Sequence, residues 1–79
     1  MNKLEILCKL EEIIREAVDD DEVVITERTV ASDVEGWDSL AQVLILGEIQ
    51  NELGVRFTSS EIGEMTNVGD LLNAIVKKL

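Results

Sequence analysis

The sequence predicts an all-α fold, a small four-helix bundle with a long first loop and a short third helix. Apolar residues recur at the three-to-four-residue spacing of amphipathic helices in three stretches of the chain. There is no Pro, and the few Gly fall mostly between these stretches. Hydrophobic residues make up 46% of the 79 residues, which is typical of a folded globule. This length is enough for one domain, so we expect residues 1–79 to form a single unit.

The first helix is expected over about residues 3–18, because apolar side chains there fall on one broad face and charged side chains fall opposite. Cys8 lies at the margin of that face. We expect Cys8 to act as a small, half-buried hydrophobic side chain and not as a reactive thiol, since no cation or base that would activate the thiol is evident nearby. The apolar face consists of Leu4, Leu7, Leu10, Ile13, Ile14, Ala17 and Val18, with Ile6 beside them.

Helical periodicity is lost from residue 19 to residue 37. Residues 22–26 are apolar and β-branched like a strand, but one strand without a partner is not stable. We therefore expect an ordered loop that brings Val24 or Ile25 to the core. The acidic run over 19–22 is expected to be solvated, because Val24 and Val30 stand where a calcium loop needs Gly and Glu. Unstructured connections of this length are usually functional.

The second helix is expected to begin at Asp38–Ser39, with Asp38 as the N-cap. It should end at Leu53, before Gly54, which is a residue typical of helix ends. Ile45, Leu46, Ile49 and Leu53 share the face expected in the core, whereas Leu40, Val43, Leu44 and Gly47 lie on roughly the opposite face.

The two remaining helices are short. Thr58 and Glu61 have the spacing of a capping box, which predicts a helix over residues 59–64. Thr66 or Asn67 is expected to cap a last helix that runs to the C-terminus. Its apolar face comprises Leu71, Leu72, Ile75 and Leu79, and its final turn holds Lys77 and Lys78, where the helix dipole favours cations.

Seventeen acidic and seven basic residues give a net charge of −10. Such a surface repels nucleic acid and anionic membranes and attracts proteins that carry basic patches. Alternatively, the charge only keeps a small monomer in solution. The single Cys, the absence of a leader-like start and the lack of a long apolar run favour a soluble, cytoplasmic protein with no membrane association.

Catalytic side chains are scarce. The chain has no His, the commonest general base, and no Tyr. One Cys without His also excludes an ordinary zinc site. We therefore expect neither an enzyme nor a metal protein.

Ser39 is the residue that suits modification best. The N-terminus of a helix offers unpaired N–H groups and partial positive charge, which favour a phosphate ester. A Ser directly after the N-cap, beside a long loop, is accessible to another enzyme but has no base of its own.

Asp38-Ser39-Leu40 resembles the Asp-Ser-Leu signature of acyl carrier proteins. The run over 33–40 and the Val-Gly-Asp of residues 68–70 are similar to the family as well. The resemblance implies that a phosphopantetheinyl transferase attaches 4′-phosphopantetheine from coenzyme A to Ser39. The arm then carries acyl thioesters between acyl-loading and acyl-processing enzymes. It also implies that Trp37, Asp38, Leu40, Val43 and Leu44 are recognition residues around that site.

The second helix departs from the pattern of fatty acid carriers, in which the face opposite the core is rich in Glu. Ala41 and Leu44 stand at positions that are often acidic in that class, which favours a carrier for a specialised pathway, such as a polyketide, nonribosomal peptide or modified sugar. An exposed apolar stripe usually marks a docking surface. The alternative is that the first loop covers it. Phe57 and Ile62, with core residues of the second and fourth helices, could line a groove for a short acyl chain.

A second interpretation remains open at this point. An acidic helical interaction module without a prosthetic group would share this composition and periodicity. Ser39 would then be only a residue at the start of a helix.

Overall fold

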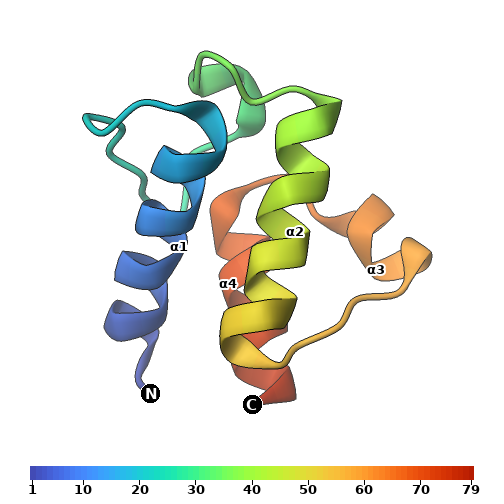
Figure 1. Ribbon diagram of the computed structural model, residues 1–79. Coiled ribbons are helices and arrows are strands. Elements are labelled where there is room, and N and C mark those ends of the chain that lie inside the picture. Colours follow the sequence, from blue (N-terminus) through green and yellow to red (C-terminus); the bar gives the residue numbers. More distant parts are fainter.

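A computed structural model describes all 79 residues and contains four α-helices and one short 3₁₀-helix. In Figure 1, α1, α2 and α4 stand side by side with α4 behind α2, whereas α3 projects to one side. Both chain ends lie at the lower end of this bundle. No strand forms, so residues 22–26 are a loop as predicted. The elements are α1 (Lys3–Val18), η1 (Ala31–Asp33), α2 (Ser39–Leu53), α3 (Ser59–Glu64) and α4 (Val68–Lys78).

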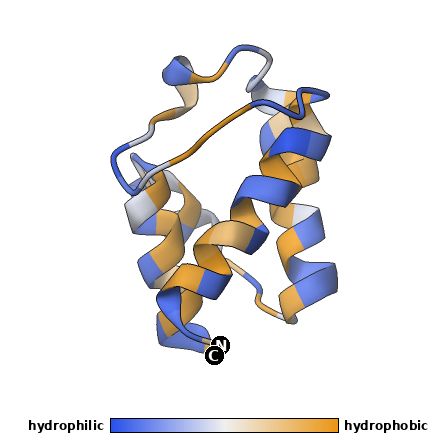
Figure 2. Ribbon diagram, turned by 90° about the vertical axis from the view of Figure 1, so that its left-hand side faces the viewer, coloured by the Kyte–Doolittle hydropathy of each residue, from blue (hydrophilic) through white to orange (hydrophobic).

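The core is one cluster of buried aliphatic side chains with no buried polar or charged residue. Figure 2 shows the hydrophobic sides of the helices turned towards each other and the hydrophilic sides turned outward. Most of the cluster comes from α1, α2 and α4, and α3 contributes no buried side chain. The cluster comprises Ile6, Leu10, Ile13, Ile14, Ile25, Val34, Ile45, Ile49, Val55, Val68, Leu71, Leu72 and Ile75.

The buried face of α1 is the predicted one except at the first turn of the helix. Ile6 is fully buried, whereas Leu4 is 69% exposed and Cys8 is exposed rather than half-buried. Leu4 and Cys8 each lie two residues from Ile6, about 200° around the helix, so a face centred on Ile6 turns both towards solvent. At the other end of the chain Leu79 follows the last turn of α4 and is also exposed.

The long first loop is ordered by polar contacts with α1. The Arg15 Nε donates a hydrogen bond of 2.7 Å to the Val23 carbonyl. The Glu11 carboxylate pairs with the Arg15 guanidinium at 3.1 Å and accepts the Ile25 N–H at 3.1 Å. These contacts fix which of the two predicted side chains reaches the core: Ile25 is buried and Val24 is 72% exposed.

The start of α4 also holds this loop. The Val68 N–H donates to the Thr29 carbonyl and the Gly69 N–H donates to the Glu27 carbonyl, each at 2.8 Å. A Cβ atom on Gly69 would lie 2.8 Å from the same Glu27 oxygen, closer than real Cβ contacts allow. Close packing at this helix start therefore requires Gly at position 69.

Candidate functional site

Ser39 is the first residue of α2, and its side chain is exposed. The preceding Asp38 caps the helix, since its carboxylate accepts the Ala41 N–H at 2.9 Å. The Asp38 carbonyl accepts the Gln42 N–H at 2.9 Å. The N–H groups of Ser39 and Leu40 have no acceptor in the chain, so the positive end of α2 is open beside the Ser39 hydroxyl.

The Ser39 hydroxyl lies in an open depression of about 450 Å³. The only carboxylate that lines it is that of Asp38, which already caps the helix. The hydroxyl is therefore accessible but has no base to make it a nucleophile. Free N–H groups and an exposed hydroxyl at a helix N-terminus fit a phosphate ester. The depression is lined by Ala31, Trp37, Asp38, Ser39 and Gln42.

Trp37 lines this depression next to Asp38. Its indole N–H donates to the Gln42 side-chain oxygen at 2.7 Å, and both side chains are half-buried. Gly36 turns the chain into this position with a φ of +87°, a conformation that L side chains rarely adopt. Sequence reasoning did not single out Gln42, because this contact depends on the rotamers of two polar side chains and leaves no signal in the periodicity.

The predicted recognition residues of α2 are uncovered. Leu40, Val43 and Leu44 are 68%, 66% and 49% exposed, and we call these three side chains the apolar stripe. The first loop does not fold over them, so that alternative is wrong. Ala41 is buried at 3% exposure, so it does not belong to the docking face on which the sequence comparison with fatty acid carriers placed it.

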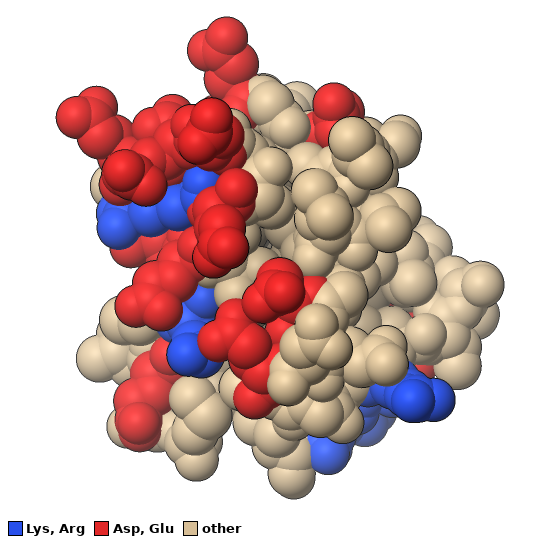
Figure 3. Space-filling view, viewed as in Figure 1, with Lys and Arg blue, Asp and Glu red and all other residues tan.

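Charge is distributed unevenly around the molecule. In Figure 3, acidic side chains gather on the side of α1 and the first loop, whereas much of the surface over the upper part of α2 carries no charge. Lower on α2, Glu52 pairs with Lys9 of α1 at 2.9 Å. Their hydrogen bond lowers the pKa of Glu52 and raises that of Lys9. Part of the α2 charge is thus engaged within the protein.

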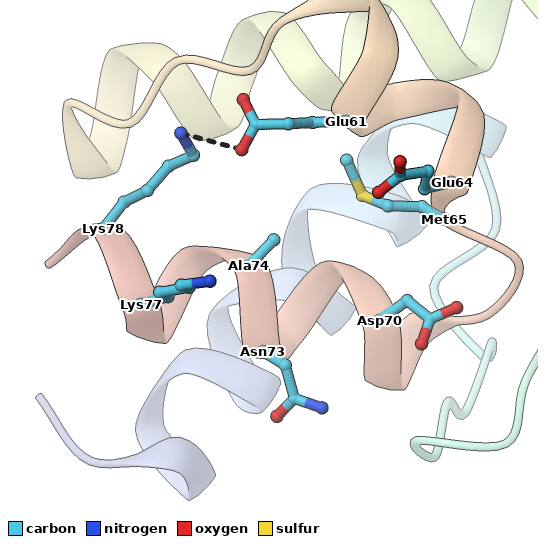
Figure 4. Close-up of a pocket in the computed structure, with 8 residues that line it drawn as sticks. All are labelled: Glu61, Glu64, Met65, Asp70, Asn73, Ala74, Lys77 and Lys78. Atoms are coloured by element: carbon cyan, nitrogen blue, oxygen red, sulfur yellow. Dashed lines mark ion pairs between the residues drawn. The ribbon is translucent and has the colours of Figure 1, made fainter.

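A hollow of about 570 Å³ lies between α3 and α4. It does not match the groove that the sequence suggested, because neither Phe57, Ile62 nor any residue of α2 lines it. Figure 4 shows its wall of mixed charge, with the Glu61–Lys78 ion pair of 2.9 Å at one end. A wall of this kind is poorly suited to an aliphatic chain. Its lining residues are Glu61, Glu64, Met65, Asp70, Asn73, Ala74, Lys77 and Lys78.

Other kinds of site are not evident. No three metal-ligating side chains come together anywhere in the chain. None of the helices combines the length and the hydropathy needed to cross a bilayer.

Comparison with known proteins agrees with the geometry at Ser39. The family model described as "Phosphopantetheine attachment site" matches residues 6–75. The acyl carrier protein of Thermotoga maritima is 35% identical over 75 residues, which cover 95% of this chain and 93% of that one. The solution NMR structure of holo acyl carrier protein from Geobacter metallireducens has a TM-score of 0.85 and 35% identity, and the match covers 91% of this chain and 83% of that one.

These matches favour the carrier over an interaction module without a prosthetic group. The family interacts with transferases and with enzymes that process acyl groups. The chain belongs to the acyl carrier protein family: it is a carrier with a covalent 4′-phosphopantetheine group and not itself an enzyme.

Proposed function

We propose that Ser39 is the attachment site of the phosphopantetheine arm and that the chain serves a specialised biosynthetic pathway. The observation that carries the first part is the exposed Ser39 hydroxyl at the open N-terminus of the fifteen-residue helix α2. The terminal thiol of the arm carries acyl groups as thioesters. The chain's own residues bind and present the arm: Asp38 fixes the first turn, and the N–H groups of Ser39 and Leu40 remain free for phosphate oxygens.

Mass spectrometry tests the attachment site. Coenzyme A and a promiscuous phosphopantetheinyl transferase should add one phosphopantetheine to the wild type and none to Ser39→Ala. Ser59→Ala is the matched control, because Ser59 is likewise exposed at the first position of a helix. Circular dichroism checks that both variants keep the fold. Modification that persists in Ser39→Ala would move the site to another serine, with Ser32 and Ser59 the first to test.

The proposal of a specialised pathway rests on the apolar stripe. Leu40, Val43 and Leu44 are exposed on the first turns of α2 after Ser39, where carriers of fatty acid synthesis would offer carboxylates to basic partners. Together with Trp37 and Asp38 we assign them to recognition by the transferase and the partner enzymes. Docking should then depend on apolar contact, while the net charge of −10 assists encounter.

Replacement of Leu44 tests this mode of docking. Leu44→Glu should slow acyl transfer to the cognate enzyme and leave Ser39 modification largely intact, because the change places a charge in the apolar stripe. Leu4→Glu is the control, since Leu4 is an exposed leucine on another helix. Transfer is measured with fully loaded protein at low and high salt, because salt screens exposed charges beyond about 8 Å at physiological ionic strength. If Leu44→Glu transfers normally and high salt abolishes the reaction, docking is electrostatic.

We further propose that residues 1–79 act as one domain, as a monomer and in the cytoplasm. A single continuous core supports the first statement. Mutual repulsion at a net charge of −10 supports the second. The free, exposed thiol of Cys8 supports a reducing compartment. Light scattering coupled to gel filtration measures the oligomeric state, and a dimer mass would contradict the proposal.

A further inference from the structure

The depression at Ser39 opens on one side of α2 only. Besides Asp38 and Ser39, it is lined by Ala31 of η1 and by Trp37 and Gln42. None of the three side chains of the apolar stripe lines it. A group attached to Ser39 therefore has two different surfaces within reach, the depression on the side of η1 and the apolar stripe.

Trp37 and Gln42 present an aromatic ring beside a free amide. Trp37 is half-buried, and its indole N–H donates to the Gln42 side-chain oxygen at 2.7 Å. Because an indole N–H can only donate, this contact fixes the orientation of the Gln42 amide. The Gln42 NH₂ group is left without an acceptor in the chain. The two side chains thus offer an apolar surface and hydrogen-bond donors at the same place.

The charge of the lining determines which part of a phosphopantetheine arm suits the depression. Asp38 is the only charged residue that lines it, and no Lys or Arg does. A phosphate group gains nothing from a surface whose only charge is a carboxylate. The depression therefore suits an uncharged part of the arm that follows the phosphate.

The pantoyl unit is the uncharged part nearest to Ser39. Only the phosphate and one methylene group separate its quaternary carbon from the Ser39 oxygen. The unit carries two methyl groups, a hydroxyl and an amide carbonyl. Residues three apart on a helix are neighbours, about 5–6 Å between Cβ atoms, so Gln42 lies within its reach. A cavity of about 150 Å³ accommodates benzene, so a depression of about 450 Å³ has room for the pantoyl unit.

We infer that Trp37 and Gln42 form a seat for the pantoyl unit, in which the indole ring packs against its methyl groups and the Gln42 NH₂ donates to its hydroxyl or carbonyl oxygen. This inference rests on Ser39 as the attachment site. Gln42 is a positioning residue, because its oxygen holds Trp37 while its amide holds the arm. The seat directs the first part of the arm towards η1, so a partner can dock on the apolar stripe without displacing it.

Attachment is established first. Holo protein is prepared with coenzyme A and a phosphopantetheinyl transferase and verified by mass, with Ser39→Ala as the control. Failure to load, or loading of Ser39→Ala, overturns the attachment site and the seat with it. All later outcomes are measured on protein modified at Ser39 and concern the seat alone.

NMR spectroscopy tests where the arm lies. Trp37 is the only Trp, so its ring protons are assigned without ambiguity. The pantoyl methyl signals should shift upfield from their positions in free coenzyme A and show a nuclear Overhauser effect to this ring. Relative to the unmodified protein, the Ala31 amide and the Gln42 NH₂ should shift, whereas the side-chain methyl signals of Val43 and Leu44 should not. Pantoyl methyl signals at the free coenzyme A positions without that effect overturn the inference, as do shifts at Val43 and Leu44 with none at Ala31.

A variant tests the positioning role. Gln42→Met removes the acceptor for Trp37 and the free NH₂ at similar size, whereas Gln50→Met makes the same change at an exposed position farther along α2. Circular dichroism checks that both keep the fold. In holo Gln42→Met the nuclear Overhauser effect should be lost and the pantoyl methyl signals should return to their free coenzyme A positions. Holo Gln50→Met should behave as the wild type. Retention of the effect in Gln42→Met would overturn the role of Gln42.

Discussion

Helices α2 and α3 begin in the same way, yet only α3 has an acidic residue in its first turn. Each begins with an exposed serine directly after an oxygen-bearing cap: Ser39 follows Asp38, and Ser59 follows Thr58. In α3 the Glu61 carboxylate returns to the cap and accepts the Thr58 N–H at 2.9 Å. The first turn of α2 contains no acidic residue.

This difference explains why similar serines suit different roles. A phosphate on Ser59 would face the negative charge of Glu61, which already satisfies the positive end of α3. A phosphate on Ser39 would meet free N–H groups at the end of a longer helix. The residue that decides between the two sites is thus the third helical residue, Glu61 in α3 and Ala41 in α2. Ala41 is buried and lies outside the docking face, but as an uncharged residue it leaves the positive end of α2 without a carboxylate at the third helical position.

The two helices also differ in how they are attached to the bundle. Ile49 of α2 is fully buried, whereas α3 has no buried side chain. Ile49→Ala should lower the free energy of unfolding by roughly 2–5 kcal/mol, because it leaves a cavity in the core. Ile62→Ala in α3 should have a clearly smaller effect, since Ile62 is only half-buried. Chemical denaturation measures both, and equal losses would mean that α3 is as firmly integrated as α2.

Loss of the N-cap should also affect α2 and α3 differently. Asp38→Ala should lower the free energy of unfolding by about 1 kcal/mol, the usual consequence of losing a cap. Thr58→Ala removes a comparable hydrogen bond, of 3.1 Å to the Glu61 N–H, but from a helix outside the core. It should increase amide hydrogen exchange over 59–64 with little change in global stability. A global loss as large as that of Asp38→Ala would contradict the distinction.

The smallest expected effect is a response of α3 to acid. The pKa of Glu61 lies below its ordinary value of 4.5, first because its carboxylate accepts the Thr58 N–H and second because it pairs with Lys78. A lowered pKa stabilises the folded form above the unfolded pKa, and this contribution is lost as the pH falls through the folded value. NMR spectra below about pH 4.5 should therefore show α3 amides moving before the bundle as a whole unfolds.

Glu61→Gln is the control for this titration, because its side chain cannot ionise. It should remove the early change in α3 and leave the later unfolding of the bundle. Simultaneous movement of α2 and α3 amides in the wild type would mean that α3 does not respond separately.

Local signals account for the parts of the fold that could be predicted. Helix caps depend only on residues close by in the sequence. The caps Asp38 and Gly54 therefore predicted the ends of α2, and the Thr58–Glu61 capping box predicted the start of α3. The attachment serine remains a prediction, but its helix-start geometry followed from the same local rules. Periodicity also identified Ile45 and Ile49 as core residues.

Features that depend on where one element meets another could not be predicted. Periodicity does not show which part of a broad apolar face meets its partner, or where a helix end leaves the core, and so the predicted faces include Leu4 and Leu79, which solvent reaches. The burial of Ala41 depends on packing around α2, and the Trp37–Gln42 contact depends on side-chain rotamers. The expected acyl groove at Phe57 and Ile62 failed for the same reason: α3 sits apart from α2, and the hollow opens towards α4 instead.

The contact between the first loop and α4 has a consequence for how this protein can vary. The Val68 and Gly69 N–H groups bind carbonyl oxygens of Thr29 and Glu27, so the link joins main chain to main chain. It requires Gly69, but it requires no particular side chain from the loop residues that accept. Glu27 and Arg28 are both exposed, and a change of either leaves these hydrogen bonds available. The loop can thus acquire new surface charge, and with it new partners, while the backbone that leads to Ser39 stays in place.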